Sequence, residues 1–161
     1  MAAVDYFLKI DGIEGESTDA KHAGWLDVDS WSWGESQPLQ PGTGTGAGVG
    51  RVQFRDFQFT SRVSKASPKL FLACASGQHI KEARLVGLKA GKEQHEFLTW
   101  TFSDVLVSSY ETTGTEGADA PYDNVALNFS KVAVTYKGQK ADGSLDAAVT
   151  AGWDVKSNKK L

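Results

Sequence analysis

The strongest constraint on the fold is a hydrophobic period of two residues along much of the chain. It begins at Val4–Ile10, where apolar side chains alternate with Asp5 and Lys9. This alternation is typical of a strand that buries one face. Further strands are expected at residues 25–33, 51–63, 82–89, 96–102, 104–112, 124–136 and 152–156. Turn-forming residues separate them, so the sequence predicts a mainly β protein.

Three of these segments change the parity of their apolar positions. The apolar side chains shift from even to odd positions near Asp29-Ser30 and again near Arg55-Asp56. Residues 124–136 show a third shift. A β-bulge at each of the first two sites would keep both sets of side chains buried. Bulges bend a sheet, and they favour a closed barrel or sandwich over a flat sheet.

Residues 67–77 carry the end signals of a short helix. We expect Ser67 to cap its N-terminus, Pro68 to occupy its first turn and Gly77 to end it. Its apolar face is expected to hold Leu70, Phe71 and Cys74. A helix this short needs a sheet to pack on. The chain, residues 1–161, is therefore expected to form a single domain: an antiparallel β-barrel of two packed sheets with one short flanking α-helix.

Charge and composition exclude several classes of function. The 17 basic and 20 acidic residues are mixed along the chain, so there is no basic stripe for nucleic acid. No run of about 20 apolar residues is available to span a membrane. The N-terminus lacks the basic and apolar regions of a cleaved signal peptide, and the single cysteine, Cys74, has no partner for an intrachain disulfide. We expect folding in the reducing cytoplasm.

A glycine-rich segment is the most unusual local feature. It comprises Gly42, Thr43, Gly44, Thr45, Gly46, Ala47, Gly48, Val49 and Gly50. The segment formally matches the glycine pattern of dinucleotide-binding loops, but that pattern needs a following helix, whereas residues 51–54 continue as a strand. Two interpretations stay open. It is either a flexible loop between strands or an arm that orders only on contact with another subunit, since ordering glycine costs backbone entropy.

Residues that could carry chemistry form no recognisable catalytic or metal-binding pattern. His22, His79 and His95 lie in separate segments without metal-ligand spacing, so we expect no metal and no other cofactor. Asp27 and Asp29 share one strand face about 7 Å apart. Glycosidases use a similar separation between paired carboxylates. A solvated acidic face is the usual explanation of such a pair, so we expect no enzymatic activity.

Five tryptophans permit a carbohydrate-binding interpretation through stacking on sugars. They are Trp25, Trp31, Trp33, Trp100 and Trp153. We prefer a core-filling role, because each lies in an alternating strand. Ser32, between two of them, must then point to the opposite face. That face is left open to solvent or to a ligand.

A series of short segments runs in order along the whole chain: VDYFLKI at 4–10, GES at 15–17, WSWG at 31–34, SPKL at 67–70, ACASG at 73–77, VLVSS at 105–109, NVALNF at 124–129, QKADG at 139–143 and GW at 152–153. Together with the glycine-rich segment, they resemble the Hcp (haemolysin-coregulated protein) family. That family forms the tube of the bacterial type VI secretion system.

The resemblance implies a small β-barrel with a flanking helix, a homohexameric ring, and stacking of rings into a tube inside a contractile sheath. It implies sheath and spike proteins as partners, and small effector proteins carried in the lumen. The protein would leave the cell through the type VI apparatus without a cleaved signal. By likeness, residues 42–50 contact the adjoining ring, Ser32 faces the lumen, where cargo is received, and residues 151–153 help to complete the barrel.

Two rival functions stay open beside this one. The first is a monomeric β-barrel module that binds carbohydrate or protein. The second is an enzyme that uses Asp27 and Asp29. Molecular mass in solution separates the tube subunit from the monomeric module.

Overall fold

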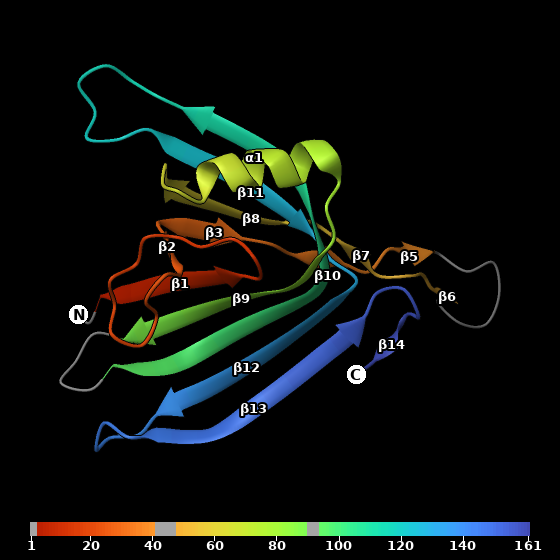
Figure 1. Ribbon diagram of the computed structural model, residues 1–161. Coiled ribbons are helices and arrows are strands. Elements are labelled where there is room, and N and C mark those ends of the chain that lie inside the picture. Colours follow the sequence, from red (N-terminus) through yellow and green to blue (C-terminus); the bar gives the residue numbers. More distant parts are fainter. Residues whose placement is uncertain (1–2, 41–47, 90–93) are drawn as a thin grey trace.

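The computed structural model describes residues 3–40, 48–89 and 94–161, which form antiparallel strands and one helix (Figure 1). The predicted mainly β fold with one short helix is confirmed. In chain order the strands are β1 (Val4–Ile10), β2 (Leu26–Val28), β3 (Ser30–Ser32), β4 (Glu35–Ser36), β5 (Leu39–Gln40), β6 (Gly48–Val49), β7 (Gln53–Phe54), β8 (Phe57–Arg62), β9 (Ile80–Lys89), β10 (His95–Thr113), β11 (Tyr122–Asn128), β12 (Lys131–Gln139), β13 (Leu145–Asp154) and β14 (Lys159–Lys160). Within these ranges, no helix has the length and apolarity to cross a bilayer.

The long strand β10 organises the sheets because it pairs with three neighbours. Its first half pairs with β9 and β12 on opposite edges, and its second half pairs with β11. The partners change near Asp104, whose φ is +55°. From β12 the order continues to β13 and β14, from β9 to β1 and β2, and from β11 to β8 and β3.

The short strands β2 and β3 connect the two ends of this arrangement. They are separated by Asp29 alone, yet β2 pairs with β1 and β3 pairs with β8. Between them the Asp29 N–H donates to the Thr60 carbonyl at 2.9 Å. The paired strands therefore lead from β10 through β9, β1, β2–β3, β8 and β11 back to β10, as in a barrel of two packed sheets. Strands β12 and β13 extend from this body (Figure 1).

The first two parity shifts in the sequence are confirmed, but their cause is a change of strand partner rather than a bulge. At Asp29 the chain leaves β1 for β8. At Arg55-Asp56 it leaves the β4–β7 pair and enters β8. Bulges instead interrupt β10 between Glu96 and Leu98 and between Val107 and Ser109.

Three predicted strand boundaries are wrong. Residues 124–136 form two strands, β11 and β12, because the chain reverses at Phe129-Ser130, which explains the third parity shift. Residues 96–102 and 104–112 join into the single strand β10. The predicted strand at 152–156 is the end of the longer β13.

The core lies between the two sheets and beneath the helix. Phe57, Phe59 and Phe102 are almost completely buried. Burial of each such ring contributes roughly 1.5–3 kcal/mol. All five tryptophans pack against one of two buried apolar clusters, as the core-filling interpretation requires.

The helix α1 (Ser67–Ser76) ends as predicted but begins differently. Gly77 ends it in the left-handed conformation, with φ of +66°. The predicted cap is wrong: Ala66 occupies the N-cap position, and the Ser67 hydroxyl donates instead to the buried Asp123 carboxylate at 2.5 Å. Leu70 is fully buried as expected, whereas Phe71 points outward and is 60% exposed.

Candidate functional site

The outer face of β3, β8 and β11 is polar and carries no charged group in its central rows. Ser30 pairs with Thr60, and Ser32 pairs with Gln58, while Asn124 and Ala126 continue the same two rows on β11. We call the surface formed by Ser30, Ser32, Gln58, Thr60 and Asn124 the polar face, and the buried Ala126 lies beneath it. The Ser30 and Thr60 hydroxyls lie 2.6 Å apart and form a hydrogen bond.

The opposite sides of these strands explain why the polar face looks outward. Trp31 pairs with Phe59, which pairs in turn with Val125, and all three contact the core. Because strand side chains alternate, the residues on either side of each lie on the opposite face, where all are exposed except the half-buried Thr60 and the buried Ala126. The predicted exposure of Ser32 on the face opposite to the tryptophans is confirmed. Its predicted role as a lumenal residue stays a prediction.

Around the glycine-rich segment, residues 34–40 and 48–55 form an arm built from two short strand pairs. Strand β4 pairs with β7, and further out β5 pairs with β6, which places Gly48 and Val49 in a strand. Residues 42–47 of the predicted segment lie outside the described residues. At the root, the Arg55 N–H donates to the Gly34 carbonyl at 2.8 Å. Figure 1 shows β5 and β6 leading away from the barrel.

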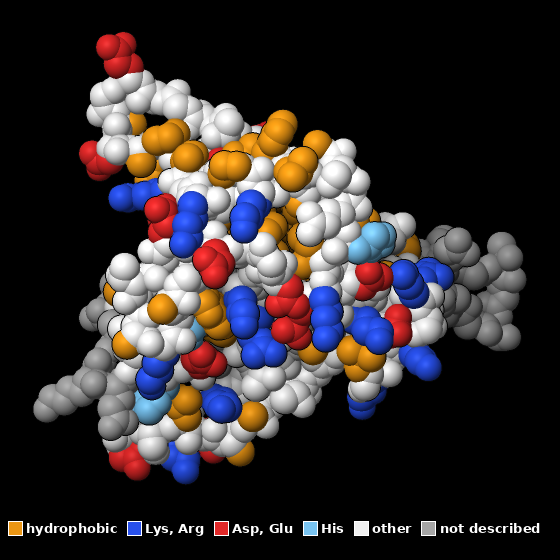
Figure 2. Space-filling view, viewed as in Figure 1, with side chains coloured by type: hydrophobic (Ala, Val, Ile, Leu, Met, Phe, Trp, Pro, Cys, Tyr) orange, Lys and Arg blue, Asp and Glu red, His pale blue; other side chains and the backbone are white. Residues whose placement is uncertain are grey.

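Two exposed apolar surfaces escape prediction from the sequence. The first, here called the helix patch, consists of Phe71 and Leu72, each 60% exposed on α1. Orange side chains gather over this part of the molecule (Figure 2). Sequence period alone places Phe71 inward, because it cannot tell which turn of a short helix meets the sheet.

The second apolar surface is the outer edge of β13. Its residues 146–151 are all exposed, and Val149 is 69% exposed. On one side they pair with β12, whereas β14 pairs only with the end of the strand, at Trp153 and Asp154. The stretch 147–151 carries no charge. A strand edge of this kind is a template for pairing with another chain.

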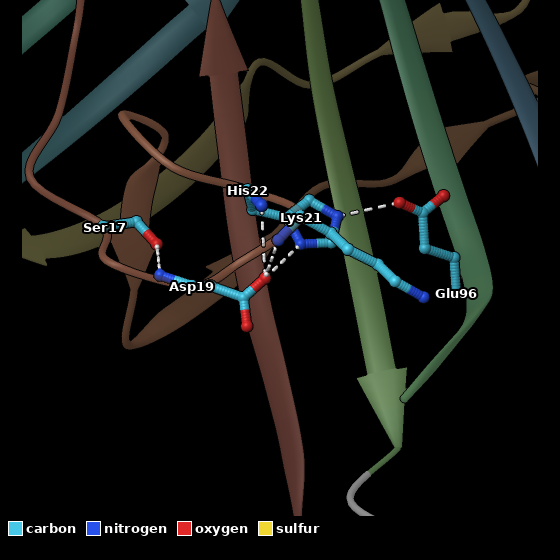
Figure 3. Close-up of polar contacts among 5 residues, drawn as sticks. All are labelled: Ser17, Asp19, Lys21, His22 and Glu96. Atoms are coloured by element: carbon cyan, nitrogen blue, oxygen red, sulfur yellow. Dashed lines mark hydrogen bonds and ion pairs between the residues drawn. The ribbon is translucent and has the colours of Figure 1, made fainter. Parts of the chain in front are cut away.

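A polar cluster around His22 joins a loop to the start of β10 (Figure 3). The side chain is 1% exposed, and its ring stacks on Phe7 at a centroid distance of 5.0 Å. Nδ1 lies 2.7 Å from the Asp19 carboxylate and Nε2 lies 2.8 Å from the Glu96 carboxylate. Ionised carboxylates only accept hydrogen bonds, so the imidazole donates to both when both of its nitrogens carry protons.

The electrostatics of this cluster support a structural role. The hydrogen bond from His22 lowers the pKa of the Asp19 carboxyl below its ordinary value. The backbone N–H groups of Lys21 and His22 also donate to Asp19 Oδ2, at 3.2 and 3.1 Å. Every polar atom of the imidazole is therefore engaged within the protein. The cluster fastens the loop rather than presenting a reactive group.

The two carboxylates considered for catalysis lie beside each other on an exposed edge. Asp27 is in β2 and Asp29 follows it, and both side chains are exposed. Partial burial raises the pKa of Asp27, and the negative charges of Asp29, Asp19 and Asp5 raise it further. Among the described residues, no three His, Cys, Asp or Glu side chains gather in a way that could hold a metal ion.

Comparison with known proteins assigns the chain to a family. A family model described as "Type VI secretion system effector, Hcp" matches residues 7–136. The chain is 46% identical over 158 residues to Protein hcp1 of Pseudomonas aeruginosa, covering 97% of this chain and 98% of that protein.

Solved structures agree with this assignment. The crystal structure of Hcp1 from Salmonella typhimurium matches with a TM-score of 0.83 and 39% identity over the whole of both chains. A structure described as that of a type six secretion system protein matches with a TM-score of 0.93 and 30% identity, covering 99% of this chain and all of that one. This is a family of secreted structural tube proteins, so the enzymatic interpretation of Asp27 and Asp29 is set aside. The chain belongs to the Hcp family of type VI secretion system proteins.

Proposed function

We propose that this chain forms homohexameric rings that stack into the inner tube of the secretion apparatus. The observation that carries the proposal is the position of two unpartnered surfaces, the helix patch and the free edge of β13, on opposite sides of the molecule (Figure 1). When two unlike surfaces meet from copy to copy, rotation can close the copies into a ring. Exposed apolar surfaces also mark sites of protein contact.

In this ring the polar face lines the lumen, with Ser32 where cargo is received. Its serine, threonine, glutamine and asparagine side chains offer hydrogen bonds without fixed charge. Such a wall holds water and lets proteins of either charge sign pass. Replacing Ser32 with arginine is expected to leave ring mass unchanged and to weaken retention of a co-expressed effector. Unchanged retention on a pull-down from rings would contradict the lumenal role.

The arm provides the contact between adjoining rings through the glycine-rich segment. The arm leaves the barrel through short strand pairs, and β5 and β6 lead away from the body of the subunit (Figure 1). Glycine lets two backbones approach closely, which suits a contact between rings. By family likeness, the tube lies within a sheath, meets a spike protein and carries small effectors. The subunit folds in the cytoplasm and leaves through the apparatus without a cleaved signal.

Deletion of residues 42–50 tests the stacking role. We expect the variant to keep the ring mass in solution and to lose the ability to extend tubes, as seen by negative-stain electron microscopy. Replacing the same residues with a Gly-Ser linker of equal length provides the matched control for chain length. Tubes of normal length from the deletion variant would contradict the role of the arm.

A further inference from the structure

Arg51 joins the arm to the C-terminal part of the chain. Its Nη2 donates to the Val155 carbonyl at 2.5 Å and to the Lys156 carbonyl at 3.1 Å. These two acceptors are consecutive residues that follow β13. The residue itself lies in the short connection between β6 and β7, where the chain returns to the barrel. One guanidinium group therefore links the arm to two neighbouring backbone positions outside it.

The segment that accepts these bonds is itself firmly attached to the barrel. The Val155 N–H donates to the Ser130 carbonyl at 2.7 Å, and the Val155 side chain packs on the core. Lys156 Nζ lies 2.8 Å from the Asp104 carboxylate, and the Ser130 hydroxyl donates to the same carboxylate at 2.7 Å. Asp104 is the residue of positive φ at which β10 changes partners. The turn at 155–158 is thus tied to the centre of the sheets.

The charge on Asp104 is secure over the ordinary range of pH. Hydrogen bonds from Lys156, Ser130 and His79 hold the pKa of its carboxyl well below the usual range. The carboxylate that holds Lys156 therefore stays charged at neutral pH, and its bond to Lys156 helps to fix the turn that accepts the bonds from Arg51.

Other contacts at the root of the arm join its two strands to each other and attach it to the core. The bond from Arg55 to Gly34 joins the two strands of the arm to each other. The guanidinium of Arg55 lies over Gly34, where a Cβ would overlap it and would make the arginine side chain move aside. Phe54 stacks on Trp33 at a centroid distance of 6.0 Å and keeps the root on the core. Arg51 lies further along the arm than these contacts. Its bonds to Val155 and Lys156 therefore constrain the direction of the arm rather than its attachment to the barrel.

We infer that Arg51 is a positioning residue that sets the direction in which the arm leaves the barrel. The turn at 155–158 is then part of the ring-stacking apparatus, although it lies about 100 residues away in sequence. This inference rests on the proposed function, in which the arm contacts the adjoining ring. An arm whose direction is already fixed loses less conformational entropy when two rings dock than a freely moving arm does. The rings therefore bind each other more strongly.

The test compares Arg51→Ala with Arg51→Lys and with Arg84→Ala, an exposed arginine on β9 paired with Glu82, as the matched control. We expect all three to keep the ring mass and melting temperature. The protein concentration needed for tube growth should rise about tenfold in Arg51→Ala, which corresponds to the loss of a charged hydrogen bond. Arg51→Lys should restore part of the growth, and Arg84→Ala should match the unmodified protein.

A distance measurement by spin labelling distinguishes a change in the direction of the arm from a change in the stability of the protein. Spin labels at Leu39→Cys on the arm and Lys81→Cys on β9, in a Cys74→Ser background, report the distance between arm and barrel. We expect a narrow distance distribution that broadens in Arg51→Ala and narrows again in Arg51→Lys. An unchanged distribution together with unchanged tube growth would overturn the inference.

Asp104→Asn gives an independent test that leaves the arm untouched. Asparagine tolerates the positive φ at this position but removes the negative charge that holds Lys156. We expect the same direction of change as Arg51→Ala, with smaller size. If deletion of residues 42–50 stops tube growth while both point variants grow normally, only the role of Arg51 fails. If the deletion also grows tubes normally, the stacking role of the arm fails as well.

Discussion

His22 shows how one buried side chain can hold a loop against a strand. It comes from the segment between β1 and β2, yet it bonds to Glu96 at the start of β10. The sequence gives no sign of this contact, because its two partners are separated by 74 positions. Asp19 is close to His22 in the sequence, but only the fold brings Glu96 to the other side of the imidazole ring.

Replacing His22 with alanine should lower the free energy of unfolding by about 2–4 kcal/mol. The change removes a buried ring packed on Phe7 and takes away the hydrogen-bond partner that the Asp19 and Glu96 carboxylates share. Urea denaturation followed by tryptophan fluorescence measures the effect. His79→Ala is the matched control, because that side chain is 74% exposed and should cost little. Equal stability of the two variants would contradict the structural role of the cluster.

The pairing of Asp19 predicts how the cluster responds to acid. Its carboxyl has a pKa below the ordinary value of 3.8 in the folded protein, chiefly because it accepts a hydrogen bond from His22. A group whose pKa is lowered by folding contributes stability above its unfolded pKa, and this contribution is lost as pH falls through the folded value. Asp19→Asn should therefore be less stable than the unmodified protein at pH 6, and the difference should shrink below pH 4. A constant difference in urea midpoint across this range would contradict the assignment.

At the scale of elements, alternation and turn residues predict most strands and the single helix. Where a segment bends from one partner strand to another, as at Asp29, the sequence shows a parity shift but not its cause. A bulge and a change of partner produce the same shift, since both displace the pattern by one residue. The reversal between β11 and β12 is hidden for a similar reason, because no glycine or proline marks it.

The start of α1 was harder to predict than its end. A serine before proline is a frequent N-cap. Here the Ser67 hydroxyl donates to the buried Asp123 carboxylate instead, which also accepts a hydrogen bond from the Tyr110 hydroxyl at 2.9 Å. Gly77 is predictable, because few residues other than glycine adopt its positive φ. The end of the helix therefore depends on one residue of the local sequence, Gly77. Its beginning depends on a contact with Asp123 in β11, which is distant in the sequence.

Gly77→Ala should destabilise the protein by about 1 kcal/mol through the strained left-handed conformation. Open space surrounds this position, so no steric clash adds to the cost. Differential scanning calorimetry should show a lower melting temperature. Gly77→Asn should lower the melting temperature less than Gly77→Ala does, because asparagine adopts the left-handed conformation more easily than alanine. If the two variants melt together, backbone strain is not the cause.

At the scale of the whole molecule, the sequence predicts a tube subunit through its likeness to a known family. The surfaces through which subunits would contact each other can be identified only from the folded structure. The polar face follows from alternation around Trp31, so Ser32 could be placed outward from sequence alone. The helix patch and the free edge of β13 could not, because exposure depends on which neighbours the topology supplies.

Charge on either contact surface should prevent closure of the ring. Leu72→Glu and Val149→Asp each place an uncompensated carboxylate in an apolar contact, which costs several kcal/mol when desolvated. Both side chains are exposed in the subunit, so the far-ultraviolet circular dichroism of each variant should match the unmodified protein. Analytical ultracentrifugation should show monomers. Lys81→Glu on β9 changes charge away from both surfaces and should still form rings.

The mass of the unmodified protein in solution tests the central claim most directly. Size-exclusion chromatography with multi-angle light scattering should give a discrete particle of six times the chain mass of 17.3 kDa. A particle that stays at the mass of one chain at high protein concentration would contradict the account.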